Sequence, residues 1–128
     1  MNKKYALATA GLATAIALPA SVLTASPASA DVERTIRCGA AEVELSVDRE
    51  NGRFEVDGSI DNAVAGSKWR VALRHDGKLV TRVNRTADYE GDLDLDRIRP
   101  NTAGKDTFKF SVRNLSTGKY CSVKVVTR

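Results

Sequence analysis

The stretch that decides the fold is EVELSVDRENGRFEVDGSI, residues 42–60. Apolar and polar residues alternate on both sides of Asn51-Gly52. Period-two alternation is typical of a half-buried β-strand. Asn-Gly is the dipeptide that a two-residue type I′ turn prefers, because both central residues need a positive φ. A two-residue loop here pairs Val47 with Val56 and brings the apolar sides of both strands together, so the turn and the register agree.

A second hairpin is predicted around Asp76-Gly77. A two-residue loop would set Val71 opposite Arg82, whereas a three-residue loop over residues 75–77, with Gly77 as a left-handed bulge residue, gives one apolar side. We therefore expect the three-residue loop. The pairs in that register are Leu73–Leu79, Val71–Thr81 and Trp69–Val83 on the apolar side, and the like-charged pairs Arg74–Lys78 and Arg70–Arg82 on the outer side.

The remaining strands follow from the same alternation. Residues 108–112 and 121–125 form a third hairpin, with two inward rows joined by the turn 115–118 and Gly118 as its left-handed residue. Residues 92–96 predict one more strand, residues 34–38 a short edge piece, and residues 99–104 a crossing loop. About seven short strands joined by turns predict an all-β fold, a single antiparallel β-sandwich.

The segment that runs from Leu95 through Pro100 and Thr102 to residues 107–112 resembles the loop and strand that cross between the sheets of fibronectin type III domains. This resemblance implies an immunoglobulin-like strand order over most of residues 31–128. The first hairpin and the 92–96 strand would then share one sheet, and the second and third hairpins the other. An architectural resemblance of this kind implies no function.

Residues 1–30 are predicted to be a cleaved secretory signal peptide. Lys3-Lys4 gives a positive start, residues 6–23 form an Ala-rich apolar run, and residues 28–30 form a small-x-small cleavage site after Ala30. A retained membrane anchor is the alternative, but this run contains Pro19 and is Ala-rich rather than strongly apolar. We expect a secreted, extracellular domain over residues 31–128 with no membrane span in its mature form.

Export places Cys38 and Cys121 in an oxidising compartment, which predicts a disulfide between them. These two cysteines and the single His75 are too few ligands for a closed zinc site. We expect His75 to lie at the surface in its turn and Trp69 to lie in the core. His75 is the only histidine for a serine triad, and no Gly-x-Ser-x-Gly motif is present, so we expect no catalytic residues, no cofactor and no enzyme activity.

Charge is distributed in blocks along the chain. Loss of Lys3 and Lys4 leaves 18 basic and 16 acidic residues, a net charge of +2. The predicted sheets sort these charges onto two outer faces. The acidic face carries Glu44, Asp48, Glu55, Asp57, Asp92, Asp94 and Asp96, and the basic face carries the predicted ligand-binding residues Arg70, Arg74, Lys78, Arg82, Lys109, Arg113, Tyr120 and Lys124.

We interpret the protein as a secreted binding module whose basic face holds an anionic envelope or extracellular polymer, since arginine suits phosphate and carboxylate. No motif for specific nucleic-acid recognition is present. In one alternative the bases only solvate the strands and block edge-to-edge pairing. In others the domain is a monomer or weakly self-associating structural protein that stacks face to back, a carrier of a small apolar molecule, or a Ca²⁺-dependent module using Asp92, Asp94 and Asp96.

Overall fold

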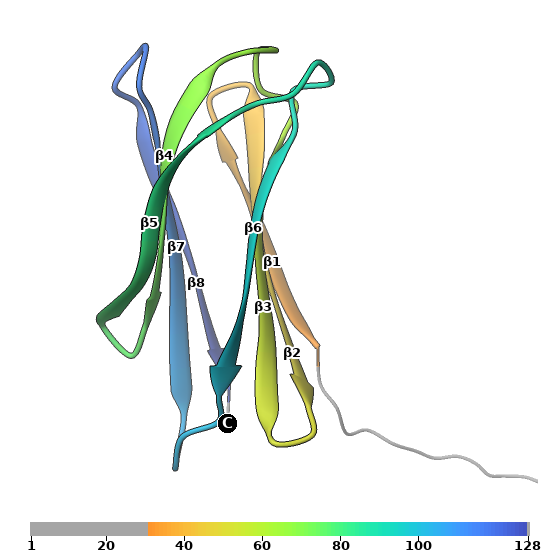
Figure 1. Cartoon of the computed structure of the whole chain (residues 1–128), viewed down its shortest axis with the longest axis vertical. Coiled ribbons are helices and arrows are strands. Elements are labelled where there is room, and N and C mark those ends of the chain that lie inside the picture. The colour runs from red at the N-terminus through yellow and green to blue at the C-terminus, as the bar shows by residue number, and fades with distance from the viewer. Residues whose placement is uncertain (1–30, 128) are drawn as a thin grey trace, which may run out of the picture. The chain divides into compact units, whose positions relative to one another are not determined.

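Eight antiparallel strands form two facing sheets in the computed structural model, which describes residues 31–127 (Figure 1). The strands are β1 (Val32–Cys38), β2 (Ala41–Glu50), β3 (Arg53–Asp61), β4 (Lys68–His75), β5 (Lys78–Thr86), β6 (Leu93–Pro100), β7 (Asp106–Asn114) and β8 (Tyr120–Thr127). The sheet orders are β1-β2-β3-β6 and β5-β4-β7-β8. The all-β sandwich is confirmed, and so is the division of the hairpins between the sheets.

Two details of the prediction are corrected. The expected edge piece at residues 34–38 is a full strand, β1, which pairs with β2 from Val32 to Cys38 and raises the number of described strands to eight. The strand expected over residues 92–96 runs from Leu93 to Pro100 and includes the first two residues of the expected crossing loop. The predicted signal peptide, residues 1–30, lies outside the described residues. Between residues 31 and 127, no helix has the length and apolar character to span a membrane.

The first hairpin has the predicted register. Val47 pairs with Val56, and Val43 pairs with Ile60. The turn residue Asn51 has a φ of 53° and the following glycine 74°, as a type I′ turn requires. Because β6 adds to the free edge of β3, the 92–96 region joins this hairpin in one sheet.

The second hairpin differs from the prediction. Its loop is the two-residue Asp76-Gly77, with φ values of 50° and 84°, and His75 pairs with Lys78 across it. The register then shifts at a bulge, where Val80 is the extra residue on β5. The observed pairs are therefore Arg74–Leu79, Leu73–Thr81, Val71–Val83, Trp69–Arg85, Arg70–Asn84 and Ala72–Arg82, and none of the five predicted pairs forms.

Phenylalanine rings fill the space between the sheets. Phe54, Phe108 and Phe110 are fully buried, and the ring centroids of Phe54 and Phe108 lie 5.3 Å apart in an edge-to-face arrangement. Trp69 is buried as predicted, and its indole N–H donates to the Ser67 hydroxyl at 2.9 Å. The two inward rows of the third hairpin also face this core, with Cys121 at their partly exposed end.

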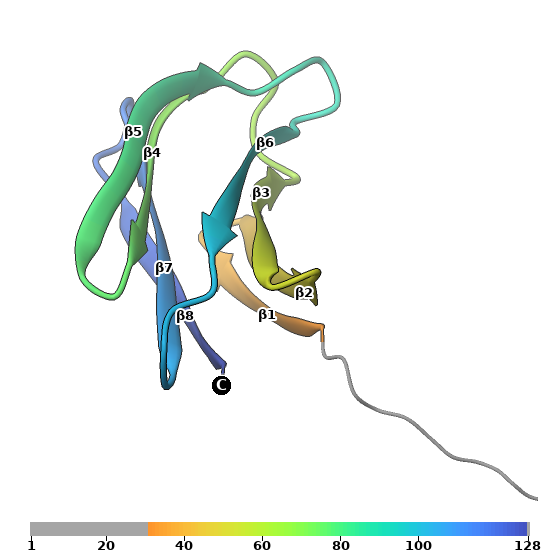
Figure 2. The same ribbon diagram turned by 60° about the horizontal axis from the view of Figure 1, so that its bottom comes forward.

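The two edges of the sandwich are held differently. At one edge β1 contacts β8, and the predicted disulfide between Cys38 and Cys121 joins the sheets with a Cα–Cα distance of 6.0 Å. The other edge is formed by β5 and β6, which the 87–92 segment connects (Figure 2). There Arg97 of β6 donates from Nη2 to the Thr81 hydroxyl of β5 at 3.2 Å.

Candidate functional site

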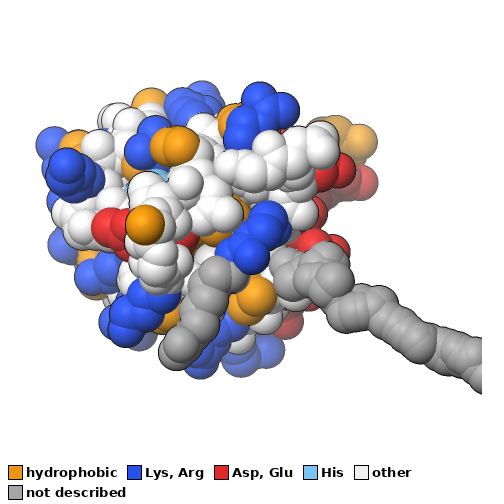
Figure 3. Space-filling model, turned by 90° about the horizontal axis from the view of Figure 1, so that it is seen from below, with side chains coloured by type: hydrophobic (Ala, Val, Ile, Leu, Met, Phe, Trp, Pro, Cys, Tyr) orange, Lys and Arg blue, Asp and Glu red, His pale blue; other side chains and the backbone are white. Residues whose placement is uncertain are grey.

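The register of the second sheet gathers seven of the eight predicted binding residues on its outer face. One row across the strands contains Arg70, Arg113 and Tyr120, on β4, β7 and β8 respectively. Viewed end-on, Lys and Arg side chains gather mostly on the side of this sheet, and acidic side chains mostly on the other (Figure 3). We define the basic face as the outward residues Arg70, Arg74, Arg82, Lys109, Arg113, Tyr120 and Lys124.

A hollow lies in the middle of the basic face. Between the row of Arg70 and the row of Arg74, the two central strands carry small residues, and Ala72 pairs with Ser111. Because these side chains are short and their neighbours are long, a pocket of about 240 Å³ opens above them. Its lining consists of Arg70, Ala72, Arg74, Arg82, Ser111, Val112, Arg113 and Tyr120. A small anionic group in this hollow would meet guanidinium groups from three strands.

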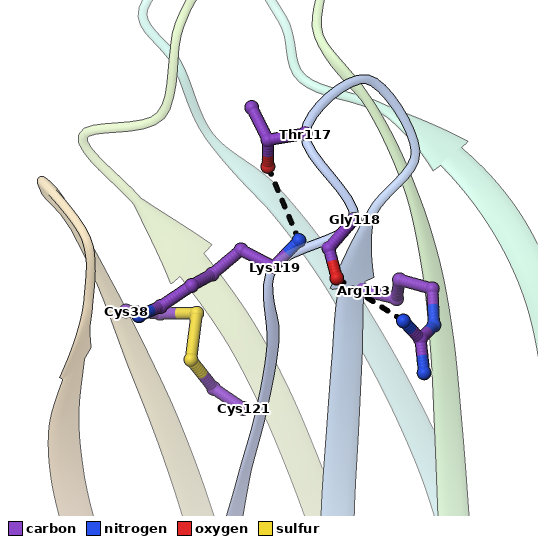
Figure 4. The surroundings of a disulfide bond; sticks show 6 residues. All are labelled: Cys38, Arg113, Thr117, Gly118, Lys119 and Cys121. Carbon is purple, nitrogen blue, oxygen red and sulfur yellow. Dashed lines mark hydrogen bonds between the residues drawn. A yellow bond between two sulfur atoms is a disulfide. The ribbon is translucent and has the colours of Figure 1, made fainter.

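Arg113 and Tyr120 are held in place at one side of the hollow. The Arg113 guanidinium lies 5.1 Å from the Tyr120 ring centroid, a cation–π distance. Arg113 also donates from Nη1 to the Gly118 carbonyl at 3.1 Å, which ties it to the β7–β8 turn (Figure 4). The Tyr120 hydroxyl donates to the Ser111 hydroxyl at 3.1 Å. These contacts orient both side chains before any ligand arrives.

Like charges oppose one another across the basic face. Arg70 pairs with Arg113, Arg74 with Lys109, and Lys109 with Lys124. Directly opposed like charges destabilise a sheet. Within residues 31–127, no ion pair joins a base of this face to an acidic side chain. The fold therefore concentrates positive charge here without internal compensation.

Two features of the predicted site are corrected by the bulge in β5. Lys78 pairs with His75, whose side chain points between the sheets, so Lys78 lies on the inward side of the sheet and outside the basic face. The predicted like-charged pairs Arg74–Lys78 and Arg70–Arg82 do not form. Their place is taken by the pairs that β4 makes with β7 on its other side.

The outer face of the first sheet is acidic. Asp57 pairs with Asp96, Asp48 with Glu55, and Glu42 with Asp61, while Glu44 and Asp94 lie in the row of Ser59. We define the acidic face as Glu42, Glu44, Asp48, Glu55, Asp57, Asp61, Asp94 and Asp96.

Burial and neighbouring acids raise the pKa of several carboxyl groups on the acidic face. For Asp57, partial burial raises the pKa and the carboxylates of Asp96 and Asp94 raise it further. The pKa of Glu55 is raised chiefly by a hydrogen bond with Glu50 and by that group's negative charge. The pKa values of Glu44, Asp48 and Asp61 are also raised, first by burial and then by neighbouring acids.

The proposed Ca²⁺ residues do not form one site. Asp94 and Asp96 lie two residues apart on β6, and Asp92 lies before the strand begins. Instead, carboxylate oxygens of Asp92, Asp88 and Glu90 lie within 4.8 Å of one another in the β5–β6 loop. One Asp88 oxygen already accepts the backbone N–H groups of Glu90 and Asp92, at 2.9 and 3.0 Å. This cluster is largely exposed, and its geometry is that of a capped loop.

A buried polar cluster was missed by sequence reasoning. His75 was expected at the surface, but it is 4% exposed and stacks on Phe108 with 4.3 Å between ring centroids. Its Nε2 lies 2.7 Å from Oδ1 of the fully buried Asp106. Arg99 donates from Nε to His75 Nδ1 at 3.3 Å. Since arginine only donates, Nδ1 accepts this hydrogen bond, and the Nε2–H of that tautomer is directed at Asp106.

Asp106 is the negative end of this cluster. Burial raises its pKa, but hydrogen bonds from the Thr102 hydroxyl and from His75 outweigh burial, so the pKa lies below its ordinary value. Its Oδ2 is buried without a hydrogen-bond partner among the described residues. The cluster joins β4, β6, the crossing loop and the start of β7 at one end of the sandwich, and we assign it to stability.

A pocket of about 480 Å³ lies at the opposite end, beside the disulfide. Three turns contribute to its lining, residues 39–40, 62–64 and 117–119, and Trp69 contributes a nearly buried side chain. Under the carrier alternative, this pocket would be the entrance for a small apolar ligand. The interior beyond it is occupied by the phenylalanine core.

Comparison with known proteins adds little. No protein-family model matches the chain, and no curated protein matches it either. A solved structure that is similar is the crystal structure of chicken MD-1 complexed with lipid IVa, at 16% sequence identity and a TM-score of 0.30. The match covers 76% of this chain and 97% of that chain. A likeness of this degree carries no argument about the ligand of this protein.

Proposed function

We propose that this protein is an exported, non-enzymatic binding module whose basic face holds an anionic polymer outside the cell. The observation that carries the proposal is the hollow of about 240 Å³ floored by Ala72 and Ser111 and bordered by four arginines. A face that served only solubility would gain by alternating the signs of its charges.

The chemistry of the hollow favours phosphate or carboxylate groups. Arginine presents a planar fork of donors that matches both groups, and its charge does not titrate in the physiological range. Tyr120 is about half exposed and flanks the hollow, so its ring can lie against a sugar or a base next to the anionic group. Three strands supply the bases, which suits an extended chain crossing the sheet.

The disulfide supports an extracellular role. The bond between Cys38 and Cys121 joins the two sheets, and disulfides form and persist in oxidising environments. Polymers with phosphodiester or carboxylate groups outside cells include wall polymers, nucleic acids and acidic polysaccharides. They share the anionic repeat that the basic face fits, and separate binding assays distinguish them.

The test compares two charge-matched variants of residues 31–128. Arg70→Glu/Arg74→Glu reverses two bases of the hollow, and Lys78→Glu/Arg85→Glu reverses two exposed bases on the other side of the same sheet. Retention on heparin, polyphosphate, duplex DNA and phosphatidylglycerol vesicles is measured as a function of salt concentration. For the wild type, binding should fall steeply with salt, and replacing Arg74 by alanine should reduce the slope of log K against log salt for DNA by about one.

The first variant should lose retention, and the second should keep most of it. The first is also expected to fold, because each introduced glutamate would face a base, Arg113 or Lys109, across to β7. Equal retention of the wild type and both variants on all four probes would overturn the proposal.

A further inference from the structure

We propose that the acidic face of one copy of this protein docks on the basic face of a second copy, giving an open, salt-sensitive stack. The acidic face carries this inference, and it stands whether or not a polymer binds the basic face. Both faces are outer surfaces of antiparallel sheets, and they have opposite charge.

The acidic face lacks compensation at its centre. Asp57 on β3 and Asp96 on β6 are directly opposed and exposed, and Asp94 lies in the next row. Among residues 31–127, the bases on this side of the sheet lie at strand ends, Arg37 on β1 and Arg53 at the start of β3. The pKa of Asp57 is raised first by partial burial and then by the negative charges of Asp96 and Asp94. A cationic surface placed against them would relieve the repulsion between these charges.

The two faces also match in spacing. In both sheets, outward residues recur every second residue, about 6.8 Å along a strand, and neighbouring strands lie about 4.8 Å apart. Outward positions on the two faces therefore lie on grids of the same dimensions, and the charges of β4 and β7 occupy every second position of theirs, because Ala72 and Ser111 lie between them. The opposed pair Asp57–Asp96 has the same separation across strands as the opposed pair Arg74–Lys109. The pair Asp57–Asp96 of one copy can therefore lie against the pair Arg74–Lys109 of another.

The symmetry of this contact determines the assembly. The two faces lie on opposite sides of one sandwich, so a copy that uses its basic face still presents its acidic face. Such a contact is heterologous and does not close into a dimer. Four strands of about eight residues give roughly 500 Å² per face, below the roughly 800 Å² per partner of a standard interface. The association should therefore be weak and strongly salt-dependent.

Complementation between two blocked variants tests the stack. Arg70→Glu/Arg74→Glu blocks the basic face. Asp57→Lys/Asp94→Lys blocks the acidic face, and the lysine introduced at position 57 would lie opposite Asp96, which favours folding. Sedimentation velocity is measured in low salt and in 0.5 M NaCl at increasing concentrations of residues 31–128.

We expect the wild type and the control Lys78→Glu/Arg85→Glu to grow in size with concentration in low salt and to be monomeric in 0.5 M NaCl. Each blocked variant alone should stay monomeric. Their equimolar mixture should form a 1:1 dimer and nothing larger, because one working acidic face meets one working basic face.

A wild type that stays monomeric in low salt, or a mixture of blocked variants that shows no dimer, would refute the stack. The heparin assay distinguishes failure of polymer binding from failure of the stack. In that assay, Asp57→Lys/Asp94→Lys should be retained at least as strongly as the wild type. Added heparin should also dissociate the stack, because heparin and the acidic face of a second copy both bind the basic face.

Discussion

Gly58 shows how one small residue sets the distance between the sheets. It lies in the inward row of β3, between Leu45 and Leu95, and the Phe110 ring from the opposite sheet packs directly on it. A Cβ at this position would lie 2.6 Å from two carbon atoms of that ring. The close approach of the ring, and not the backbone conformation, is what requires glycine here.

Gly58→Ala should therefore destabilise the fold by roughly 1–3 kcal/mol, the usual cost of overpacking a core. Urea unfolding measures this loss. Ser59→Ala, one residue along on the outer face, is the matched control and should change the free energy of unfolding by less than about 0.5 kcal/mol. Adding Phe110→Leu to Gly58→Ala should remove part of the clash. Equal stability of the two alanine variants would show that Phe110 does not constrain Gly58.

Asp106 is the residue on which the buried polar cluster depends. Asp106→Ala should cost about 3 kcal/mol, because it removes the acceptor of His75 and of Thr102 and leaves the charge of Arg99 without its distant partner. Thr102→Val removes a single hydrogen bond and should cost about 1 kcal/mol. Thermal melts at pH 7 compare them, and an Asp106→Ala variant no less stable than Thr102→Val would contradict this role.

The position of His75 could be predicted only in part from the sequence. Continuing the alternation of Trp69, Val71 and Leu73 by one step would have placed it inward, as observed. Its proximity to a turn favoured the surface instead. Its partner Asp106 lies 31 residues away, and a contact over that distance leaves no local pattern in one sequence.

At the scale of elements, the β4–β5 hairpin shows what alternation can and cannot locate. The apolar sides of its two strands face the core together only if one extra residue is present somewhere between the two apolar runs. The pattern establishes that this residue exists, but placing it in the turn or in β5 satisfies the pattern equally. The structure places it at Val80, which turns Val80 inward and leaves Leu79 exposed. The first hairpin contains no insertion, so there turn and register could both be predicted.

The disulfide acts on the edge where β1 meets β8. It joins cysteines 83 positions apart, so reducing it should lower the free energy of unfolding by roughly 4 kcal/mol through the entropy of the unfolded chain. Cys38→Ala/Cys121→Ala measures this in urea. Hydrogen exchange should increase first in β1, an edge strand that pairs only with β2. An unchanged unfolding midpoint would mean that packing alone holds this edge.

At the scale of the whole molecule, the sorting of charge onto two faces could be predicted because each charge block falls within strands of one sheet. The sequence could not predict that small residues form the floor of the hollow. Ala72 and Ser111 become neighbours only when β4 pairs with β7, and their sequence positions carry no sign of that contact.

The charge on the acidic face makes stability depend on pH in a specific direction. A raised pKa means that the folded state binds a proton more tightly than the unfolded state, so stability rises as pH falls. This applies to Asp57, Glu44 and the other crowded carboxyls, whose ordinary pKa values are 3.8 for Asp and 4.5 for Glu. Asp106 has a lowered pKa, so its contribution is present above pH 3.8 and is lost as pH falls further.

As the pH is lowered from 7 in low salt, the melting temperature should therefore rise to a maximum near pH 4–5. It should decrease again once the pH is below about 3.5. At pH 7, 0.5 M NaCl should raise it, because salt screens repulsion within each face. Asp57→Asn should raise the melting temperature at pH 7 and reduce its increase on acidification, whereas Asp106→Ala should flatten the fall at low pH. A melting temperature that declines steadily from pH 7 to pH 4, with no gain from salt, would show that the like charges on the two faces do not control the stability of the fold.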